Sequence, residues 1–348
     1  MKTIGYVAHS SESQLVPFPF ERRNLRPNDV AIEILYCGIC HSDLHQVRND
    51  WGFAQYPMVP GHEIVGKVID LGSEVKKYKI GDRVAIGCMV DSCQECDQCQ
   101  QGEEQFCRER MTQTYCSPDR ITGDMIYGGY SKHIVAREEF VLSVPDSLDL
   151  SRAAPILCAG ITTFSPLRNY NVGSNSRVGV AGLGGLGHMA VKLAKAMGAT
   201  VTVLTHSAGK VDAAKELGAD RVVVMSDKDA VEKAANSLAL IINTIPVKHD
   251  INPYLPLLDI KGTLVMIGQV GTIEEPNTMP MVFGNRTIAG SLIGGIAKTE
   301  VLDFCAEHNI YPECEAIRMD EINEAFARLS KGKVAHRLVI DMATLEAK

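Results

Sequence analysis

The sequence predicts an α/β protein of two domains, the first rich in β-strands and the second built on a doubly wound parallel sheet. Its 348 residues compare with roughly 150 residues for one domain. Before residue 150, short strand-like runs are separated by Gly, Pro and Asn. After residue 160, such runs alternate with helical stretches that end in glycine. The change of pattern predicts a boundary between residues 1–150 and the domain that follows.

Composition and charge exclude several classes of protein. Hydrophobic residues make up 45% and charged residues 22%, as in ordinary globular proteins. The net charge of −7 gives no overall attraction to nucleic acid or to an anionic membrane, and no apolar run approaches the ~18 residues of a membrane span. The 11 cysteines are an odd number, and MKTIGYVAHSSESQ lacks the pattern of a secretory signal. We therefore expect a cytoplasmic protein whose thiols bind metal or fill the core.

The elements of the first domain are predicted from short runs rich in β-branched residues. Gly, Pro and Asn bound these runs, and few long helical periods occur among them. The expected strands are residues 30–35, 64–70, 83–86 and 133–135.

The elements of the second domain are predicted from a regular alternation. The chain reads RVGVAGLGGLG, HMAVKLAKAMGA, TVTVLTH, KVDAAKELGAD and RVVVM, and continues through LALIINTI and GTLVMIG to about residue 290. Buried strands that alternate with helices are typical of βαβ units on a parallel sheet. Helices at 299–309 and 320–330 and a strand in HRLVID are expected next, and the pattern leaves open on which domain they pack.

A glycine motif in the second domain predicts a nucleotide site. Gly182, Gly184 and Gly187 form G-x-G-x-x-G between an expected strand and an expected helix. These glycines permit a tight turn, let the backbone approach a pyrophosphate, and allow the strand and the helix to pack closely. The motif indicates a Rossmann dinucleotide-binding domain, although a glycine-rich turn can also serve packing alone. The expected binding loop consists of Gly182, Leu183, Gly184, Gly185, Leu186 and Gly187.

The end of the next strand indicates which dinucleotide binds. An NAD site is expected to have an acidic residue there, which hydrogen-bonds the adenosine ribose. This segment instead carries Thr205, His206, Ser207 and Lys210, and no acid. Hydroxyls and cations suit a 2′-phosphate, which a carboxylate would repel, so NADP(H) is the predicted cofactor. Alternatively, His206 and Lys210 are solvated residues at the start of a helix.

Four closely spaced cysteines predict a structural metal site. Cys93, Cys96, Cys99 and Cys107 form C-x2-C-x2-C-x7-C. Four thiolates can complete a tetrahedral Zn²⁺ shell with no open position. The segment is polar and has no hydrophobic period, so zinc would supply the folding free energy that a core cannot. An iron–sulfur cluster and a nucleic-acid zinc ribbon are the competing interpretations, and the acidic flanks disfavour the second.

Three dispersed residues form a weaker candidate site. Cys40, His62 and Cys158 could make a three-ligand zinc site with an open fourth position. Spacing alone does not bring them together, and each could instead be buried in the core. Cys37 and Cys40 also form a C-x2-C pair that could be a redox pair or half of a zinc finger.

Longer motifs are similar to one known family. GICHSD, GHEIVGKVIDLGSEV, the four-cysteine segment and GLGGLG together resemble the zinc-dependent medium-chain alcohol dehydrogenases. Within that family, GICHSDLHQV, GGYS, PILCAGIT and AGSLIGG are most similar to the cinnamyl alcohol dehydrogenase branch, which consists of NADP-dependent aldehyde reductases with a broad substrate range. The resemblance covers essentially the whole chain.

The resemblance implies a fold and a pair of zinc sites. A GroES-like catalytic domain would comprise residues 1–150 completed by 291–348, and the Rossmann domain residues 151–290. Each chain would bind two zinc ions, one structural and one catalytic. Because the family ligand matches Cys40, the catalytic ion would be held by Cys40, His62 and Cys158, and Cys37 is expected in the core.

The resemblance also implies roles for residues around these ligands. In aldehyde reduction, zinc would polarise the carbonyl and hydride would pass from the nicotinamide to its carbon. The carried-over roles are proton relay for Ser42 and His45, orientation of His62 by Asp43, a place beside the zinc for Glu63, and contact with the pyrophosphate for His41 and Arg337.

The last expectations concern the substrate pocket, the oligomeric state and the alternative functions. Trp51, Phe53 and Ile293 form an apolar candidate pocket for aromatic or aliphatic aldehydes and alcohols, although the single tryptophan could equally lie in the core. The resemblance implies a homodimer through the Rossmann domain. The rivals are an NAD-dependent alcohol or polyol dehydrogenase of the same fold, and a non-catalytic zinc protein that senses a nucleotide.

Overall fold

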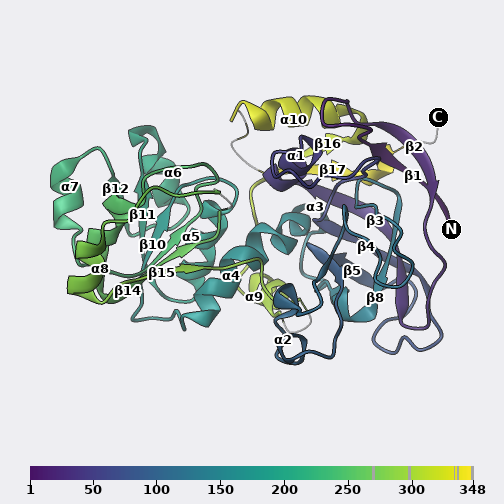
Figure 1. Ribbon diagram of the computed structural model, residues 1–348, viewed down its shortest axis with the longest axis horizontal. Helices are drawn as coiled ribbons and strands as arrows, with labels where there is room; N and C mark the ends of the chain where they lie inside the picture. Colours follow the sequence, from purple (N-terminus) through teal and green to yellow (C-terminus); the bar gives the residue numbers. More distant parts are fainter. Residues whose placement is uncertain (269–270, 297–298, 333, 335–336, 346–348) are drawn as a thin grey trace. The chain divides into compact units, whose positions relative to one another are not determined.

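The computed structural model describes residues 1–268, 271–296, 299–332, 334 and 337–345 (Figure 1). Two compact units make up the chain. Unit 1 comprises Met1–Cys158 together with Gly295–Lys348, and unit 2 comprises Ala159–Gly294. The C-terminal part, whose packing the sequence pattern left open, thus belongs with the N-terminal part.

Unit 1 is organised around a sheet of seven strands in the described chain, in the order β16-β17-β3-β4-β5-β9, with β8 also paired to β3. All its pairs are antiparallel except β16 with β17. Its strands are β3 (Asp29–Ile39), β4 (Ile64–Leu71), β5 (Arg83–Ile86), β8 (His133–Arg137), β9 (Leu142–Ser143), β16 (Cys314–Arg318) and β17 (Arg337–Asp341). Val30, Ile32 and Ile34 of β3 lie in the main core of the unit.

Smaller elements cover this sheet. Helix α10 presents Ile322, Phe326 and Leu329 to the core, because residues at helical spacing share one face. The remaining elements of unit 1 are β1 (Lys2–Val7), β2 (Val16–Glu21), β6 (Met89–Asp91), β7 (Thr112–Gln113), α1 (His41–Val47), α2 (Asp97–Gln100), α3 (Leu150–Ala153), α9 (Val301–Glu307) and α10 (Ile322–Ser330).

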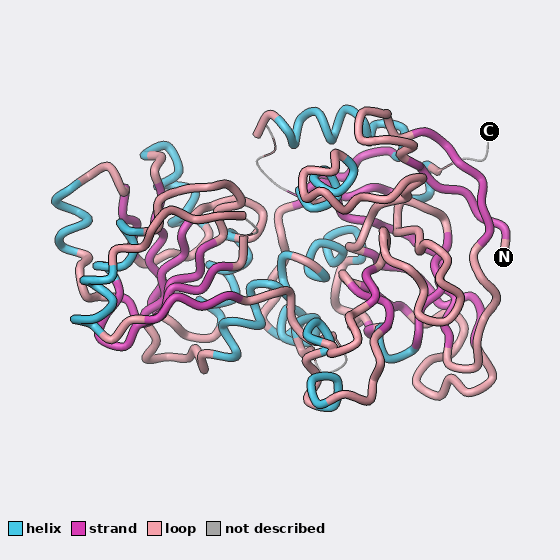
Figure 2. The backbone as a smooth tube through the Cα atoms, in the orientation of Figure 1, coloured by secondary structure: helices cyan, strands magenta, loops and turns pink. Residues whose placement is uncertain are grey.

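Unit 2 contains a parallel sheet of six strands in its described part, in the order β12-β11-β10-β13-β14-β15. Figure 2 shows these strands running side by side, with helices around them. The chain order reverses between β10 and β13, which is where open parallel sheets bind ligands. Its elements are α4 (Ala159–Asn169), β10 (Arg177–Ala181), α5 (Gly187–Ala196), β11 (Thr200–Thr205), α6 (Val211–Glu216), β12 (Arg221–Val224), α7 (Lys228–Lys233), β13 (Leu238–Asn243), β14 (Leu258–Met266), α8 (Thr278–Gly284) and β15 (Thr287–Gly290).

The predicted α/β class is confirmed, and the element bounds differ mostly at their ends. The expected strand at 83–86 is β5, and the expected strand at 30–35 extends through Ile39. The helices expected at 299–309 and 320–330 are shorter, Val301–Glu307 and Ile322–Ser330. Periodicity locates a buried face but not the last turn of a helix, where capping decides.

Candidate active site and zinc sites

Three sulfur and nitrogen donors from distant segments converge in unit 1. Cys40 directly follows β3 and caps helix α1, whose Ser42 N–H donates to the Cys40 sulfur at 3.4 Å. His62 lies two residues before the start of β4, and Cys158 follows the short helical turn Ala154–Leu157. The sulfurs of Cys40 and Cys158 are 3.9 Å apart. All three residues are buried, and their donor atoms and a Glu63 oxygen lie within 4.8 Å of one another.

Asp43 orients the imidazole of this cluster. Its Oδ1 lies 2.9 Å from Nδ1 of His62 and also accepts the Gly61 N–H at 3.1 Å. Its Oδ2 accepts the Cys40 N–H at 3.0 Å and the Tyr130 hydroxyl at 3.1 Å. When Nδ1–H of His62 donates to the carboxylate, Nε2 carries the free electron pair and can bind a metal ion. The side chain expected to orient His62 therefore contacts it.

Hydrogen bonding between the two sulfurs favours one thiolate in the cluster. The pKa of the Cys40 thiol is held well below its usual range, chiefly because Cys158 hydrogen-bonds to it, and the same bond raises the pKa of Cys158. Burial raises the pKa of Glu63 to about 7, although the Arg337 guanidinium opposes this. A thiolate is the form of cysteine that binds metal.

Glu63 and Arg337 form a buried ion pair. Arg337 starts β17 and reaches Oε1 of Glu63. Within the described part of the chain, Oε2 of Glu63 and Nε of Arg337 are buried without a hydrogen-bond partner. An unpaired carboxylate oxygen beside two sulfurs and an imidazole fits Zn²⁺, which takes S, N and O ligands. The donor set therefore fits the catalytic ion that was expected.

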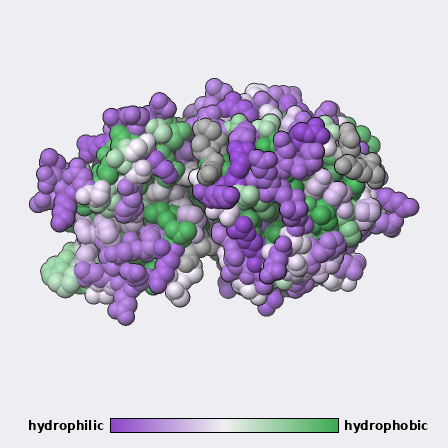
Figure 3. All heavy atoms as spheres, turned by 90° about the horizontal axis from the view of Figure 1, so that it is seen from above, coloured by the Kyte–Doolittle hydropathy of each residue, from purple (hydrophilic) through white to green (hydrophobic). Residues whose placement is uncertain are grey.

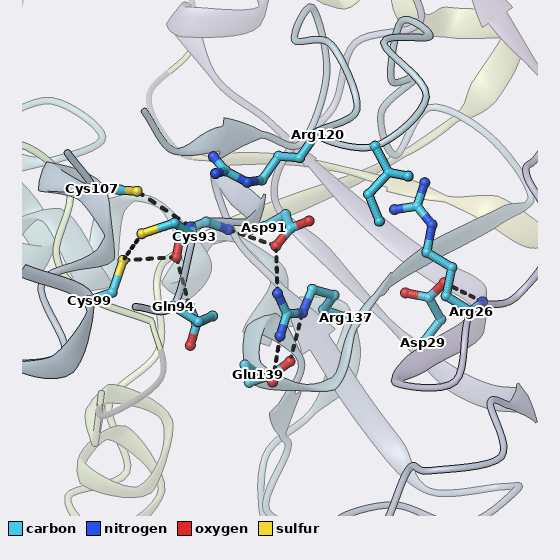
Figure 4. Close-up of polar contacts among 12 residues, drawn as sticks. Arg26, Asp29, Asp91, Cys93, Gln94, Cys99, Cys107, Arg120, Arg137 and Glu139 are labelled. Atoms are coloured by element: carbon cyan, nitrogen blue, oxygen red, sulfur yellow. Dashed lines mark hydrogen bonds and ion pairs between the residues drawn. The ribbon is translucent and has the colours of Figure 1, made fainter. Parts of the chain in front are cut away.

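The four clustered cysteines also converge in unit 1, as Figure 4 shows for Cys93, Cys99 and Cys107. The four sulfurs lie within 4.8 Å of one another. Backbone N–H groups point at them, from Cys93 to the Cys107 sulfur at 3.4 Å and from Cys96 to the Cys93 sulfur at 3.3 Å. Such donors stabilise thiolates. The set fits a closed tetrahedral Zn²⁺ site.

Ion pairs hold the start of this cysteine segment to the rest of unit 1. Arg137 of β8 donates to Asp91 at 3.2 Å and to Glu139 at 2.9 Å (Figure 4). At the other end, Arg120 donates to the backbone oxygen of Arg110 at 2.8 Å. The segment is thus tied at both ends, while its interior has the four cysteines in place of a hydrophobic core.

The glycine loop of unit 2 has the backbone geometry that its motif requires. Gly182 follows β10 with a φ of +88°, a conformation that side chains disfavour. A Cβ on Gly187 would lie 2.1 Å from the Gly182 oxygen, so only glycine lets α5 pack this closely. A Cβ on Gly184 would meet nothing within 4 Å, which leaves room for a ligand against the backbone. The remaining loop residues are Leu183, Gly185 and Leu186.

The polar residues expected to bind the 2′-phosphate gather beside this loop. Thr205 is the last residue of β11, and its hydroxyl accepts the Ser207 N–H at 3.2 Å. The Lys210 ammonium donates to the Leu183 oxygen at 3.2 Å, so the lysine touches the glycine loop. The His206 Nε2 lies 3.3 Å from the Tyr254 hydroxyl.

The relay residue His45 and the pocket residues Trp51 and Phe53 lie along one aromatic row. The His45 ring is 6.2 Å from that of His41 and 5.8 Å from that of Trp51, which stacks on Phe53 at 5.9 Å. Nδ1 of His45 is 2.7 Å from Asp50, and both side chains are partly exposed. Ser42 is half-buried in α1. The third pocket candidate, Ile293, belongs to unit 2.

Comparisons with known proteins agree with these features. The family model "Alcohol dehydrogenase GroES-like domain" matches residues 26–146, and the model "Zinc-binding dehydrogenase" matches residues 185–307. "NADP-dependent alcohol dehydrogenase C 1" of Mycolicibacterium smegmatis is 50% identical over 100% of both chains. "Aldehyde reductase YahK" of Escherichia coli is 48% identical over 99% of both. The chain belongs to the zinc-dependent medium-chain alcohol dehydrogenases.

Solved structures place this dehydrogenase in the cinnamyl alcohol dehydrogenase-like branch. The Sorghum bicolor cinnamyl alcohol dehydrogenase SbCAD4 has a TM-score of 0.95, with 42% identity over 100% of this chain and 99% of that one. The Helicobacter pylori enzyme, solved with NADP(H), has a TM-score of 0.92, with 41% identity over 99% of both chains. The dehydrogenase is therefore an oxidoreductase, and a non-catalytic nucleotide sensor is not supported. No described helix is long and apolar enough to cross a membrane.

Sequence reasoning missed three residues at the sites of this dehydrogenase. Cys88 hydrogen-bonds with Cys158, which lowers the pKa of Cys88. Tyr130 donates to Asp43, and Tyr254 contacts His206. Tyr130 lies in the GGYS motif that contributed to the resemblance, so a signal existed without a role attached to it. Cys88 and Tyr254 carried no signal of their own.

Proposed function

We propose that this dehydrogenase transfers a hydride between NADP(H) and a primary alcohol or aldehyde, aromatic or aliphatic and apolar. The observation that carries the proposal is the buried cluster of Cys40, His62 and Cys158, beside an orienting Asp43. Relatives named as NADP-dependent alcohol dehydrogenase and aldehyde reductase, each matched along essentially their full length, support the reaction and the cofactor.

The residues of the cluster hold the metal that the reaction needs. When bound there, Zn²⁺ acts as a Lewis acid that polarises the carbonyl and offsets the negative charge developing on its oxygen. Cys40 and Cys158 supply thiolates, which balance the ionic charge. Asp43 keeps the His62 ring in the tautomer whose Nε2 can bind. Glu63, neutralised in part by Arg337, adds a carboxylate oxygen beside the donors.

Protonation of the product alkoxide falls to side chains of helix α1 and its end. The Ser42 hydroxyl donates the proton, and His45 restores it from solvent. The contact of His45 with Asp50 at 2.7 Å, on a partly exposed surface, suits exchange with water. The aromatic row that includes Trp51 and Phe53 suits contact with an apolar substrate.

The glycine loop of unit 2 and the N-terminus of α5 hold the pyrophosphate. A contact of His41 and Arg337 with the pyrophosphate stays a prediction from the resemblance. Thr205, His206 and Ser207 hold the 2′-phosphate together with the Lys210 ammonium, which the Leu183 contact keeps at the loop.

The test compares the rates of NADPH and NADH oxidation with benzaldehyde-type substrates, on protein whose zinc content has been measured. We expect NADPH to give the higher kcat/KM, and Cys158→Ala to lose activity and about one zinc per chain. Equal or higher rates with NADH, or a preference for polyols, would contradict the proposal. Cys305→Ala, a buried cysteine of the same unit outside both clusters, serves as the matched control.

The dehydrogenase is further proposed to form a homodimer through unit 2. β15 ends the described sheet with one edge unpaired, and edges of this kind add strands. Helix α8, which precedes β15, exposes Met279, Val282 and Phe283 by 60%, 75% and 80%. On the face drawn in Figure 3, hydrophobic groups occur at several places among hydrophilic ones. The exposed apolar side chains of α8 adjoin the strand with the unpaired edge, and exposed apolar patches mark interfaces. Light scattering should give twice the chain mass, and a monomer mass would refute the dimer.

A cytoplasmic location is proposed because all 11 cysteines, each in the described part of the chain, are free thiols. Cell fractionation tests this, and recovery of the enzyme with disulfide-bonded exported proteins would contradict it.

A further inference from the structure

A buried arginine supports a loop behind the catalytic cluster. Arg22, which follows β2, is 8% exposed and faces the loop of residues 127–133. Its guanidinium donates to the Gly128 oxygen at 2.8 Å, the Ser131 hydroxyl at 2.7 Å and the His133 oxygen at 2.9 Å, and also to the Tyr127 oxygen. No carboxylate takes part in these bonds. The guanidinium therefore serves to fix the backbone of the loop.

The same loop is bonded to the segment that leads into His62. The Gly128 N–H donates to the Val59 oxygen at 2.6 Å, and the Gly129 N–H to the Gly61 oxygen at 2.8 Å. The Tyr130 N–H donates to the Pro60 oxygen at 2.9 Å. A Cβ on Gly61 would lie 2.6 Å from the Tyr130 ring, so the ring lies directly on the residue before His62.

The Tyr130 hydroxyl completes this arrangement. Tyr130 is fully buried, and its hydroxyl donates to Oδ2 of Asp43 at 3.1 Å. Oδ1 of the same carboxylate contacts His62 at 2.9 Å. Because the two oxygens belong to one rigid group, a donor that holds Oδ2 also fixes the direction in which Oδ1 accepts from the imidazole.

We propose that Tyr130 is a positioning residue for the zinc ligand His62, acting through Asp43, and that Arg22 holds Tyr130 in place through the loop. The inference rests on the proposed function of the Cys40, His62 and Cys158 cluster as a zinc site. Tyr130 contacts neither substrate nor metal in this role. It narrows the orientations of Asp43, and therefore raises the affinity of the site for zinc.

The test measures zinc affinity in the holoenzyme with Tyr130→Phe, which removes the hydroxyl and keeps the ring. Competition with a dipicolinate chelator should show catalytic zinc bound about tenfold more weakly, the lower end of the effect of losing a partner behind a metal ligand. The four-cysteine site should keep its affinity and serves as the internal reference. Tyr78→Phe, which removes a buried hydroxyl bonded to the Val141 oxygen in the same unit, is the matched control. The visible spectrum of the Co²⁺-substituted catalytic site should shift in Tyr130→Phe and not in Tyr78→Phe.

Two further variants separate positioning from general destabilisation. In an Asp43→Ala background, Tyr130→Phe should no longer change zinc affinity, because the residue through which it acts is gone. Arg22→Lys, which keeps the Tyr130 hydroxyl but loosens the loop, should also weaken catalytic zinc and covers the case in which Tyr130→Phe does not fold. The inference is overturned if Tyr130→Phe binds catalytic zinc within twofold of the wild-type affinity. If Tyr130→Phe does not fold, the same criterion applies to Arg22→Lys. An equal loss in Tyr78→Phe also overturns the inference. A wild-type cluster that binds no zinc refutes the proposed function instead.

Discussion

Replacing Arg22 with methionine should destabilise unit 1 by about 3 kcal/mol. The change removes a guanidinium that serves three backbone oxygens and one hydroxyl. The Ser131 hydroxyl can donate to the Gly128 oxygen or to the His133 oxygen, but only to one at a time. Two of the three carbonyl oxygens therefore lose the donor that Arg22 provides. Each loss should lower the free energy of unfolding by about 1–3 kcal/mol.

One term opposes this loss. Burial lowers the pKa of the Arg22 guanidinium to about 9, which reflects the unfavourable transfer of its charge from water. Methionine fills much of the same volume without a charge to bury, so part of the free energy lost with the hydrogen bonds is regained. The net value of about 3 kcal/mol corresponds to a change of about 100-fold in the unfolding equilibrium constant.

The assay follows urea unfolding by the fluorescence of Trp51, the one tryptophan of the chain, which lies in unit 1. The midpoint should fall without a change in the slope, since the surface exposed on unfolding is the same. Arg48→Met is the control, because Arg48 is exposed and bonds to the Ser330 hydroxyl at 3.0 Å, and it should change stability by less than about 0.5 kcal/mol. A loss below about 1 kcal/mol in Arg22→Met, or one no larger than in Arg48→Met, would refute the reasoning.

Three further experiments, two with variants and one by chemical labelling, probe the cofactor site, the structural metal site and a buried thiol. His206→Arg should raise the ratio of kcat/KM for NADPH over NADH about tenfold, because a guanidinium binds a phosphate with two hydrogen bonds; steady-state kinetics check this, and an unchanged ratio counts against His206 as a phosphate ligand. Cys107→Ser should lower the zinc content from about two per chain to about one while the catalytic ion stays bound, as metal analysis would show; loss of both ions would contradict independent sites. Burial raises the pKa of Cys305 to about 12, so iodoacetamide at pH 8 should label it about 1,000-fold more slowly in the folded enzyme than after unfolding; peptide mass spectrometry measures the label, and equal rates would disprove its burial.

The sites differ in how far the sequence could predict them. The four-cysteine site and the glycine loop each occupy one short stretch, so spacing along the chain is already spacing in space. Cys40, His62 and Cys158 come from three segments, and only the resemblance joined them. The sheet brings two of them together, since β3 pairs with β4 in the register Cys37 to Ile64, which places Cys40, after the end of β3, near His62, before the start of β4. Cys158 follows a helical turn outside the sheet.

The ion pair of Glu63 with Arg337 could not be found from local pattern. The two residues are 274 positions apart, and their meeting depends on β17 pairing with β3 in the register Leu338 to Ile39. The contact of Tyr254 with His206 could not be found from local pattern either. Tyr254 lies in the turn Asn252–Leu257 and His206 follows β11, so the two residues are 48 positions apart in the sequence. Contacts of this kind follow from tertiary packing, on which the periodicity of a single segment carries no information.

The position of Asp43 shows why chemistry, and not size alone, fixes a residue near a metal site. Each carboxylate oxygen accepts two donors, Oδ1 from Gly61 and His62 and Oδ2 from Cys40 and Tyr130. An asparagine has the same shape, but its NH2 group would face two N–H or O–H donors in either orientation. Only a carboxylate can accept all four at once. Helix α1, the segment before His62 and the loop with Tyr130 are therefore joined through one charge, and the geometry of the catalytic ligands depends on it.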